Sequence, residues 1–216
     1  LAPLIVAALA GLILVRGIKL QHHRVGSFLQ CSFHGNLGYI GLAVSFYFLG
    51  DEGFTRASIL AGFVMLLQNF LAVVALSRFN KEPDQEISTL SLIRRVLLNP
   101  VIISAMAGMA FSLTALDLPV ILDRSLGILS GMALPLALLV IGTSISFAQM
   151  RQQLRLTVLI GVLKLLLLPA TGLILFHLLD LHRIEYLPAL ILLASPTATI
   201  SYVMATEMAG DADMAT

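Results

Sequence analysis

Two clusters of small and polar residues interrupt otherwise apolar stretches, and they are the places where this sequence could do chemistry. They comprise Gly35, Asn36 and Gly38 in one stretch and Ser195, Pro196 and Thr197 in another. Glycine and asparagine are weak helix formers, and proline removes a backbone donor, so both clusters predict a broken helix. Broken backbone at membrane depth is tolerated only inside protein or beside a water-filled cavity. Because the N-terminal ends of half-helices carry partial positive charge, the two clusters together predict a site for an anion.

A structural interpretation competes with this prediction. Small residues also allow helices to pack closely, and Pro196 could simply kink its helix. For one cluster alone the two interpretations are equally good. The presence of two such clusters, at matching positions of two apolar stretches, favours the anion site.

Lys164 is the basic residue that lies well inside an apolar stretch. It follows Leu154 by ten residues, which places it about 15 Å along a helix. A buried ammonium group at that depth is costly unless it has a partner or water. Lys164 could therefore attract an anionic substrate, tie its helix to neighbouring helices, or extend its amine to the membrane surface; the sequence leaves these alternatives open.

Residue patterns typical of enzymes are absent. The sequence contains no GxSxG, HExxH, paired CxxC or GxxxxGK[ST] motif, so no catalytic residue and no cofactor are predicted. Ser32 and His34 lie two positions apart and point to different sides of a helix. The single cysteine, Cys31, excludes an intrachain disulfide. The histidines form no metal set: His22 and His23 are expected in a loop and His177 and His182 near the outer interface. His34 is expected within the membrane, where a hydrogen-bonded core histidine is favoured over a proton carrier.

Composition explains where these residues must sit. Hydrophobic residues make up 58% of the 216 residues, charged residues 12%, and mean hydropathy is +0.97, which excludes an ordinary soluble domain. A net charge of +1 gives no reason to expect nucleic acid as a partner. The apolar segments run from Leu1 to Val15, Phe28 to Leu49, Ala57 to Leu76, Val96 to Leu116, Ile121 to Ile145, Leu154 to Leu179 and Tyr186 to Met208. They are long and Leu/Ala-rich without alternating polarity, so we predict an all-α polytopic membrane protein.

Basic residues fall mainly on one side of these predicted spans. If the segments alternate in direction, one side holds Arg16, Lys19, Arg24, Arg78, Lys81, Arg94, Arg95, Arg151 and Arg155, and the other holds Arg56, Arg124 and Arg183. The positive-inside rule then places the first side in the cytoplasm. Glu207, Asp211 and Asp213 follow the last segment and are expected to be solvated.

A weak internal repeat suggests how the spans are organised. Residues 10–15, AGLILV, resemble residues 171–176, TGLILF, and Gly50-Asp51 resembles Gly210-Asp211. An offset of five spans would place the two copies in opposite orientations, as in an inverted repeat. We therefore expect a fragment of a ten-helix, five-plus-five inverted-repeat transporter with two broken crossover helices. Residues 1–79 would hold the last three helices of the first repeat, 80–95 a cytoplasmic connector, and 96–216 the first four helices of the second repeat.

The order of these motifs resembles the auxin efflux carrier family, which includes plant PIN-formed carriers and bacterial putative malonate permeases. Residues 97–145 are similar to the start of that family's second half, through Asn99-Pro100, Leu118-Pro119 and Ile141-Gly142. Residues 35–44 and 193–216 resemble its two crossover helices. Gly41-Leu42 stands where we expect a proline, so the first break depends on glycine and asparagine. The short connector favours a bacterial type of member, and hence the inner membrane.

The resemblance implies a secondary transporter of a small organic anion, such as a carboxylate, working by alternating access. The substrate-binding residues would be Asn36, Gly38, Lys164, Ser195, Pro196 and Thr197, with no metal site. The lipid bilayer is the other expected partner, while coupling to protons or sodium and a homodimeric state are left open. The alternatives are a non-transporting membrane receptor or structural subunit and, less favoured, an intramembrane enzyme.

Overall fold

The computed structural model describes residues 1–79, 90, 94, 97, 98, 100–114, 116–144 and 147–215. Most of the predicted connector, residues 80–95, lies outside this part of the chain. The described secondary structure is helical apart from one isolated two-residue bridge. Its helices are α1 (Ala2–Ile18), α2 (His22–Phe33), η1 (Leu37–Gly41), α3 (Leu42–Phe79), α5 (Pro100–Ser112), α6 (Val120–Ser144), α7 (Phe147–Val162), η2 (Leu163–Leu167), α8 (Leu168–Leu178), α9 (Arg183–Ala194), α10 (Ile200–Glu207) and α11 (Ala212–Ala215).

Each predicted apolar segment coincides with one or more of these helices, and the prediction of an all-helical protein is confirmed. The local differences are small. His22 and His23 do not lie in a loop, as predicted, but form the start of α2. The reason is that α2 begins with a polar turn, which hydropathy assigns to the gap between spans.

The long helix α3 contains two of the predicted spans, because the chain reverses inside it at Gly50. Gly50 has φ 71° and ψ −167°, a backbone conformation that favours glycine. The reversal brings Ala57 and Ala61 of the second arm against Leu37 of η1, the segment that leads into the first arm. The predicted boundary between the second and third spans is therefore a tight turn between two packed helical arms.

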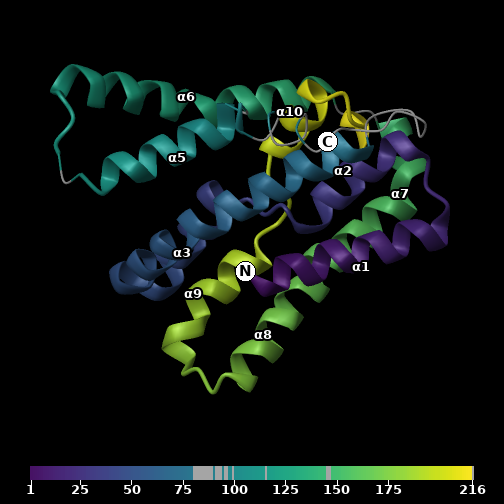
Figure 1. Cartoon of the computed structure of the whole chain (residues 1–216), viewed down its shortest axis with the longest axis horizontal. Helices are drawn as coiled ribbons and strands as arrows, with labels where there is room; N and C mark the ends of the chain where they lie inside the picture. Colours follow the sequence, from purple (N-terminus) through teal and green to yellow (C-terminus); the bar gives the residue numbers. More distant parts are fainter. Residues whose placement is uncertain are drawn as a thin grey trace.

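Helices from both ends of the sequence pack into one body. α1 lies against α8, α2 against α7, and α3 against α9, whereas α5 and α6 form a hairpin that projects away from this body (Figure 1). The largest buried cluster includes Phe28 and Phe33 of α2, Leu4 of α1 and Leu168 of α8. Residues before and after the central connector thus share one hydrophobic core.

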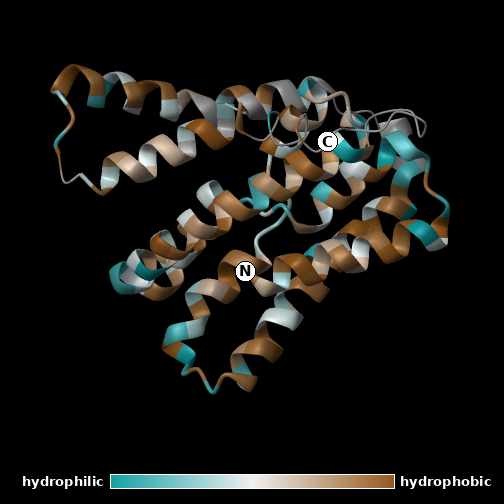
Figure 2. Ribbon diagram, in the orientation of Figure 1, coloured by the Kyte–Doolittle hydropathy of each residue, from teal (hydrophilic) through white to brown (hydrophobic). Residues whose placement is uncertain are grey.

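The outer surface of the body is apolar, and its polar residues gather at opposite ends. Figure 2 shows hydrophilic residues at the reversal of α3 and the loop between α8 and α9 at one end, and around the start of α2 at the other. Among the described residues, the helical stretches Leu37–Phe79 and Gln153–Leu178 are long and apolar enough to cross a membrane. Side chains such as Ile59, Leu166 and Ile174 are exposed on these stretches, as expected of helices whose solvent is lipid.

Candidate functional site

The first interruption separates α2 from η1. α2 ends at Phe33, and His34 adopts an extended conformation with φ −77° and ψ 100°. Asn36 then starts the next helical turn, because its side-chain Oδ1 accepts a hydrogen bond of 3.2 Å from the backbone N–H of Tyr39. Asparagine is among the best residues for this N-terminal capping position. The sequence thus ends one helix and begins another within three residues.

The second interruption separates α9 from α10. α9 ends at Ala194, and Ser195 is extended with φ −63° and ψ 142°. Pro196 has no N–H to give to the carbonyl of Leu192, four residues earlier. The Ser195 hydroxyl takes that place, donating a hydrogen bond of 2.6 Å to the Leu192 carbonyl oxygen.

The two interruptions pair with each other through their backbones. The N–H of Asn36 donates to the carbonyl of Pro196 at 2.8 Å, and the N–H of Ala198 donates to the carbonyl of His34 at 3.0 Å. These bonds form a minimal antiparallel bridge between Gly35 and Thr197. Two segments far apart in sequence therefore satisfy each other's unpaired backbone groups in the interior, as buried backbone requires.

Gln68 of α3 completes the pairing of the first interruption. Its side-chain Oε1 accepts from the N–H of Gly35, and its Nε2 donates to the carbonyl of Gly35, both at 3.1 Å. The buried amide of Gln68 thus pairs with both backbone groups of Gly35, as a residue on a neighbouring β-strand would. We did not predict this residue, although two adjacent amides, Gln68 and Asn69, inside an apolar span were a signal that could have found it.

Lys164 lies beneath the crossing rather than at the membrane surface. Only 1% of the residue is exposed, and its Nζ donates a hydrogen bond of 2.9 Å to the carbonyl oxygen of Leu193, near the end of α9. Of the alternatives left open by the sequence, the one observed is a tie to a neighbouring helix. Gly35 is close enough that a Cβ added there would lie 3.0 Å from Nζ and 2.9 Å from the Ser195 hydroxyl.

A cavity of about 500 Å³ opens at this crossing. Its lining comprises His34, Gly35, Asn36, Leu37, Gly38, Tyr39, Met65, Gln68, Asn69, Ser104, Ala198, Thr199 and Ile200. Asn36 and Gly38, predicted as site residues, are therefore lining residues. The first turns of η1 and α10 lie at the cavity, and the helix dipole gives these N-terminal ends partial positive charge.

The other predicted site residues support the crossing without lining this cavity. Ser195 and Lys164 are buried behind it, Thr197 is half-buried, and Pro196 is exposed. The hydroxyl of Thr197 donates to the carbonyl of Cys31 at 3.2 Å. The second interruption contributes its next two residues, Ala198 and Thr199, to the lining of the cavity instead.

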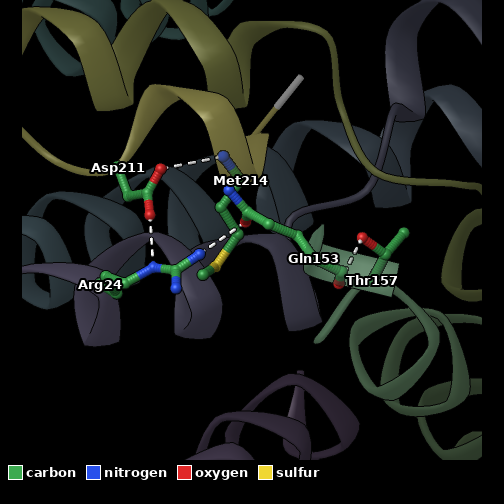
Figure 3. A network of polar contacts seen from close by, with 5 residues as sticks. All are labelled: Arg24, Gln153, Thr157, Asp211 and Met214. Atoms are coloured by element: carbon green, nitrogen blue, oxygen red, sulfur yellow. Dashed lines mark hydrogen bonds and ion pairs between the residues drawn. The ribbon is translucent and has the colours of Figure 1, made fainter. Parts of the chain in front are cut away.

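A polar network ties three helices together at the end of the body where α2 starts (Figure 3). The guanidinium of Arg24 donates to the carboxylate of Asp211 and to the side-chain oxygen of Gln153, both at 2.6 Å. Asp211 also accepts from the N–H of Met214 at 3.0 Å. Only 12% of the Asp211 side chain is exposed, so the prediction that it is solvated is wrong. Its partner lies almost two hundred positions away in sequence, which local sequence patterns do not reveal.

Similarity to known proteins agrees with this architecture. Residues 1–215 match the family described as membrane transport proteins. The chain belongs to this family. It is also 26% identical over 213 residues to an uncharacterized transporter of Methanocaldococcus jannaschii, covering 95% of this chain and 66% of that protein. No solved structure matches this chain significantly.

Family membership confirms the resemblance to auxin efflux carriers that the motifs of the sequence suggested. The family is one of polytopic membrane transport proteins and not of enzymes. The chain spans about two thirds of the length of its archaeal relative.

Proposed function

We propose that this protein is a secondary carrier that moves a small organic anion, such as a carboxylate, across the membrane by alternating access. The observation that carries the proposal is the cavity at the meeting point of two interrupted helices. In carriers of this general kind, discontinuous helices form the substrate site near the bilayer midplane. A volume of about 500 Å³ is within the range of small-molecule sites.

The electrostatics of the cavity favour an anion. The half-helices η1 and α10 both present their N-terminal ends to it, and no residue in its described lining is acidic. The ammonium group of Lys164 lies behind Gly35, and its charge reaches the cavity through low-dielectric protein. The amides of Asn36 and Asn69 and the hydroxyl of Thr199 supply neutral donors for a carboxylate.

The packing suggests which parts would move. The paired backbones hold both interrupted helices together, so we infer that they move as one unit against the α5–α6 hairpin. A separation into a moving unit and the α5–α6 hairpin is compatible with the proposed five-plus-five inverted repeat, of which the present chain would supply seven crossings. The site residues of the proposal fall into two groups: Asn36, Gly38 and Thr199 contact the substrate, whereas Ser195, Pro196, Thr197 and Lys164 hold the crossing in shape.

The test compares two substitutions of Asn36 in the full-length protein, reconstituted into liposomes. Asn36→Asp keeps a capping oxygen for Tyr39 but adds a negative charge to the cavity. Uptake of radiolabelled acetate, malonate, succinate and indole-3-acetate is measured, with internal unlabelled anion driving exchange. We expect uptake of at least one of these anions by the wild type, and its loss in Asn36→Asp at unchanged thermal stability.

A charge added elsewhere provides the control. Thr55→Asp places the same negative charge on an exposed position near the reversal of α3, and it should leave uptake unchanged. The proposal is wrong if the wild type exchanges none of the four anions, or if Asn36→Asp and Thr55→Asp transport equally well.

A further inference from the structure

We propose that the ammonium group of Lys164 is a tethered cation, occupying a site at the crossing that would otherwise take a sodium ion. Transport by this protein would then require no sodium at the crossing. The consequence for transport rests on the proposed carrier function. The cation site itself rests on the backbone around α9.

The site begins with a carbonyl group that the broken helix leaves free. In a continuous helix the Leu193 carbonyl would accept from the N–H of Thr197, four residues later. The chain leaves the helix at Ser195, so this bond is not made, and Thr197 joins the bridge to Gly35 instead. The Lys164 ammonium donates to the Leu193 oxygen at 2.9 Å. Half-helix C-terminal ends and unwound carbonyls are the groups that bind the coupling cation in carriers with broken helices.

The charge of Lys164 is balanced by oxygen dipoles, not by a carboxylate. In the described part of the chain, the ion pairs Arg24–Asp211 and Arg56–Glu52 do not include Lys164. The neighbours of the ammonium group include the C-terminal end of α9, which carries partial negative charge, the backbone of Gly35, and the buried imidazole of His34. A free monovalent cation at the position of the ammonium group would likewise lie at the C-terminal end of α9, beside the Leu193 carbonyl.

A π-helical turn places Lys164 in the core. Lys164 lies in the π-helical segment η2, whose wider turn inserts an extra residue into the helix. Pro169, the second residue after this segment, has no N–H for an ordinary helical bond to the Leu165 carbonyl, so the chain tolerates the wider turn there. Such single π-turns are found frequently at functional sites. The helix is therefore modified at the position that brings a charged side chain into the core.

The ammonium group also contacts the first interruption, which gives it influence over the cavity. A Cβ on Gly35 would lie 3.0 Å from Nζ, and Gly35 itself lines the cavity. One cation thus lies against both interrupted segments. A sodium ion at this position would have to be recruited in every transport cycle, whereas a lysine side chain is always present.

The test measures the thermal unfolding midpoint of the purified full-length protein in sodium chloride, methylammonium chloride and choline chloride at equal ionic strength. The wild type should give the same midpoint in all three salts, because its cation is covalently attached. Lys164→Ala should unfold at a temperature lower by about 5 °C or more in choline chloride. Sodium or methylammonium should restore part of this loss by entering the vacated space.

Two further variants distinguish a cation site from general destabilisation. Lys164→Met fills the space without charge, so it should be destabilised but insensitive to the choice of salt. Lys19→Ala removes an exposed lysine at the end of α1 and should behave as the wild type. The inference is overturned if Lys164→Ala responds to sodium and methylammonium no more than Lys164→Met and Lys19→Ala do.

If the Lys164 variants yield no folded protein, measurements on the wild type alone still test the cation site. The wild-type midpoint and uptake of the four anions should be equal in sodium chloride and choline chloride, and a clear increase of either in sodium would overturn the inference. Absence of uptake with every anion in both salts would refute the proposed carrier function, while the salt dependence of the midpoint would still decide the cation site.

Discussion

The two interruptions at the crossing meet the same physical problem with different chemistry. At His34 to Asn36, neutral amides satisfy the unwound backbone: Gln68 pairs with both groups of Gly35, and Asn36 caps the following turn. At Ser195 to Thr199, a hydroxyl and a buried ammonium group satisfy the carbonyls at the end of α9. The first interruption lines the cavity, whereas the second is mostly turned away from it.

This difference separates the residues that contact a ligand from those that maintain the crossing. Amides can both donate and accept, so they suit a surface where water and a carboxylate exchange. A fixed cation suits a place where nothing exchanges. Substitutions in the first interruption should therefore alter transport, and also stability where a cap or a backbone partner is lost, whereas conservative ones in the second should alter mainly stability.

The largest effect should come from Gln68→Leu, which leaves the N–H and the carbonyl of Gly35 without their side-chain partner. Each buried unsatisfied group costs about 1–3 kcal/mol, so for two groups we expect a loss of about 2–6 kcal/mol in the free energy of unfolding. Denaturant unfolding in detergent measures it. Gln21→Leu, at an exposed position without a capping bond, is the control. Equal stability of the two variants would contradict the account.

Gly35→Ala should follow, because it disturbs both interruptions at once. The added methyl group would lie 2.9 Å from the Ser195 hydroxyl and 3.0 Å from the Lys164 ammonium. Overpacking of this kind costs about 1–3 kcal/mol. We expect a lower unfolding midpoint and loss of anion uptake. Gly62→Ala, where an added methyl group meets nothing within 4 Å, should leave both unchanged; the same loss in that variant would show that the effect is not specific to the crossing.

A matched pair of cap substitutions tests the comparison itself. Asn36→Ala and Ser195→Ala each remove one side-chain hydrogen bond at an interruption, and each should cost about 1 kcal/mol of unfolding free energy. Uptake should fall in Asn36→Ala and persist in Ser195→Ala. Ser125→Ala, which removes an exposed bond to Ile121, is the baseline for stability. Equal loss of uptake in the two variants would mean that the interruptions do not differ in function.

The smallest effect should come from Thr197→Val. It removes the hydrogen bond to the Cys31 carbonyl while keeping the shape of the side chain. We expect a loss of about 0.5–1 kcal/mol and normal uptake. Thr55→Val, which removes an exposed bond to Asp51, should cost less. A complete loss of uptake in Thr197→Val would place this residue in the substrate site instead of behind it.

Sequence patterns predicted the interruptions because Gly, Asn and Pro act locally: each weakens or ends a helix through its own backbone chemistry. They did not predict Gln68 as a partner of Gly35, nor the pairing of Arg24 with Asp211, since both contacts depend on how distant helices pack. Lys164 shows the limit most clearly. Its depth was predictable, but its partner, the Leu193 carbonyl, becomes available only through the break in another helix.

The central claim is that the cavity at the crossing holds the transported anion, and substrate protection tests it most directly. Cys31 is replaced by alanine, and a single cysteine is placed at Thr199, which lines the cavity, or at the exposed Thr55. The rate of labelling by a charged methanethiosulfonate reagent is measured with and without the anion that the wild type exchanges. The account predicts that the anion slows labelling at position 199 severalfold and leaves position 55 unchanged. Equal rates at position 199 with and without the anion would contradict it.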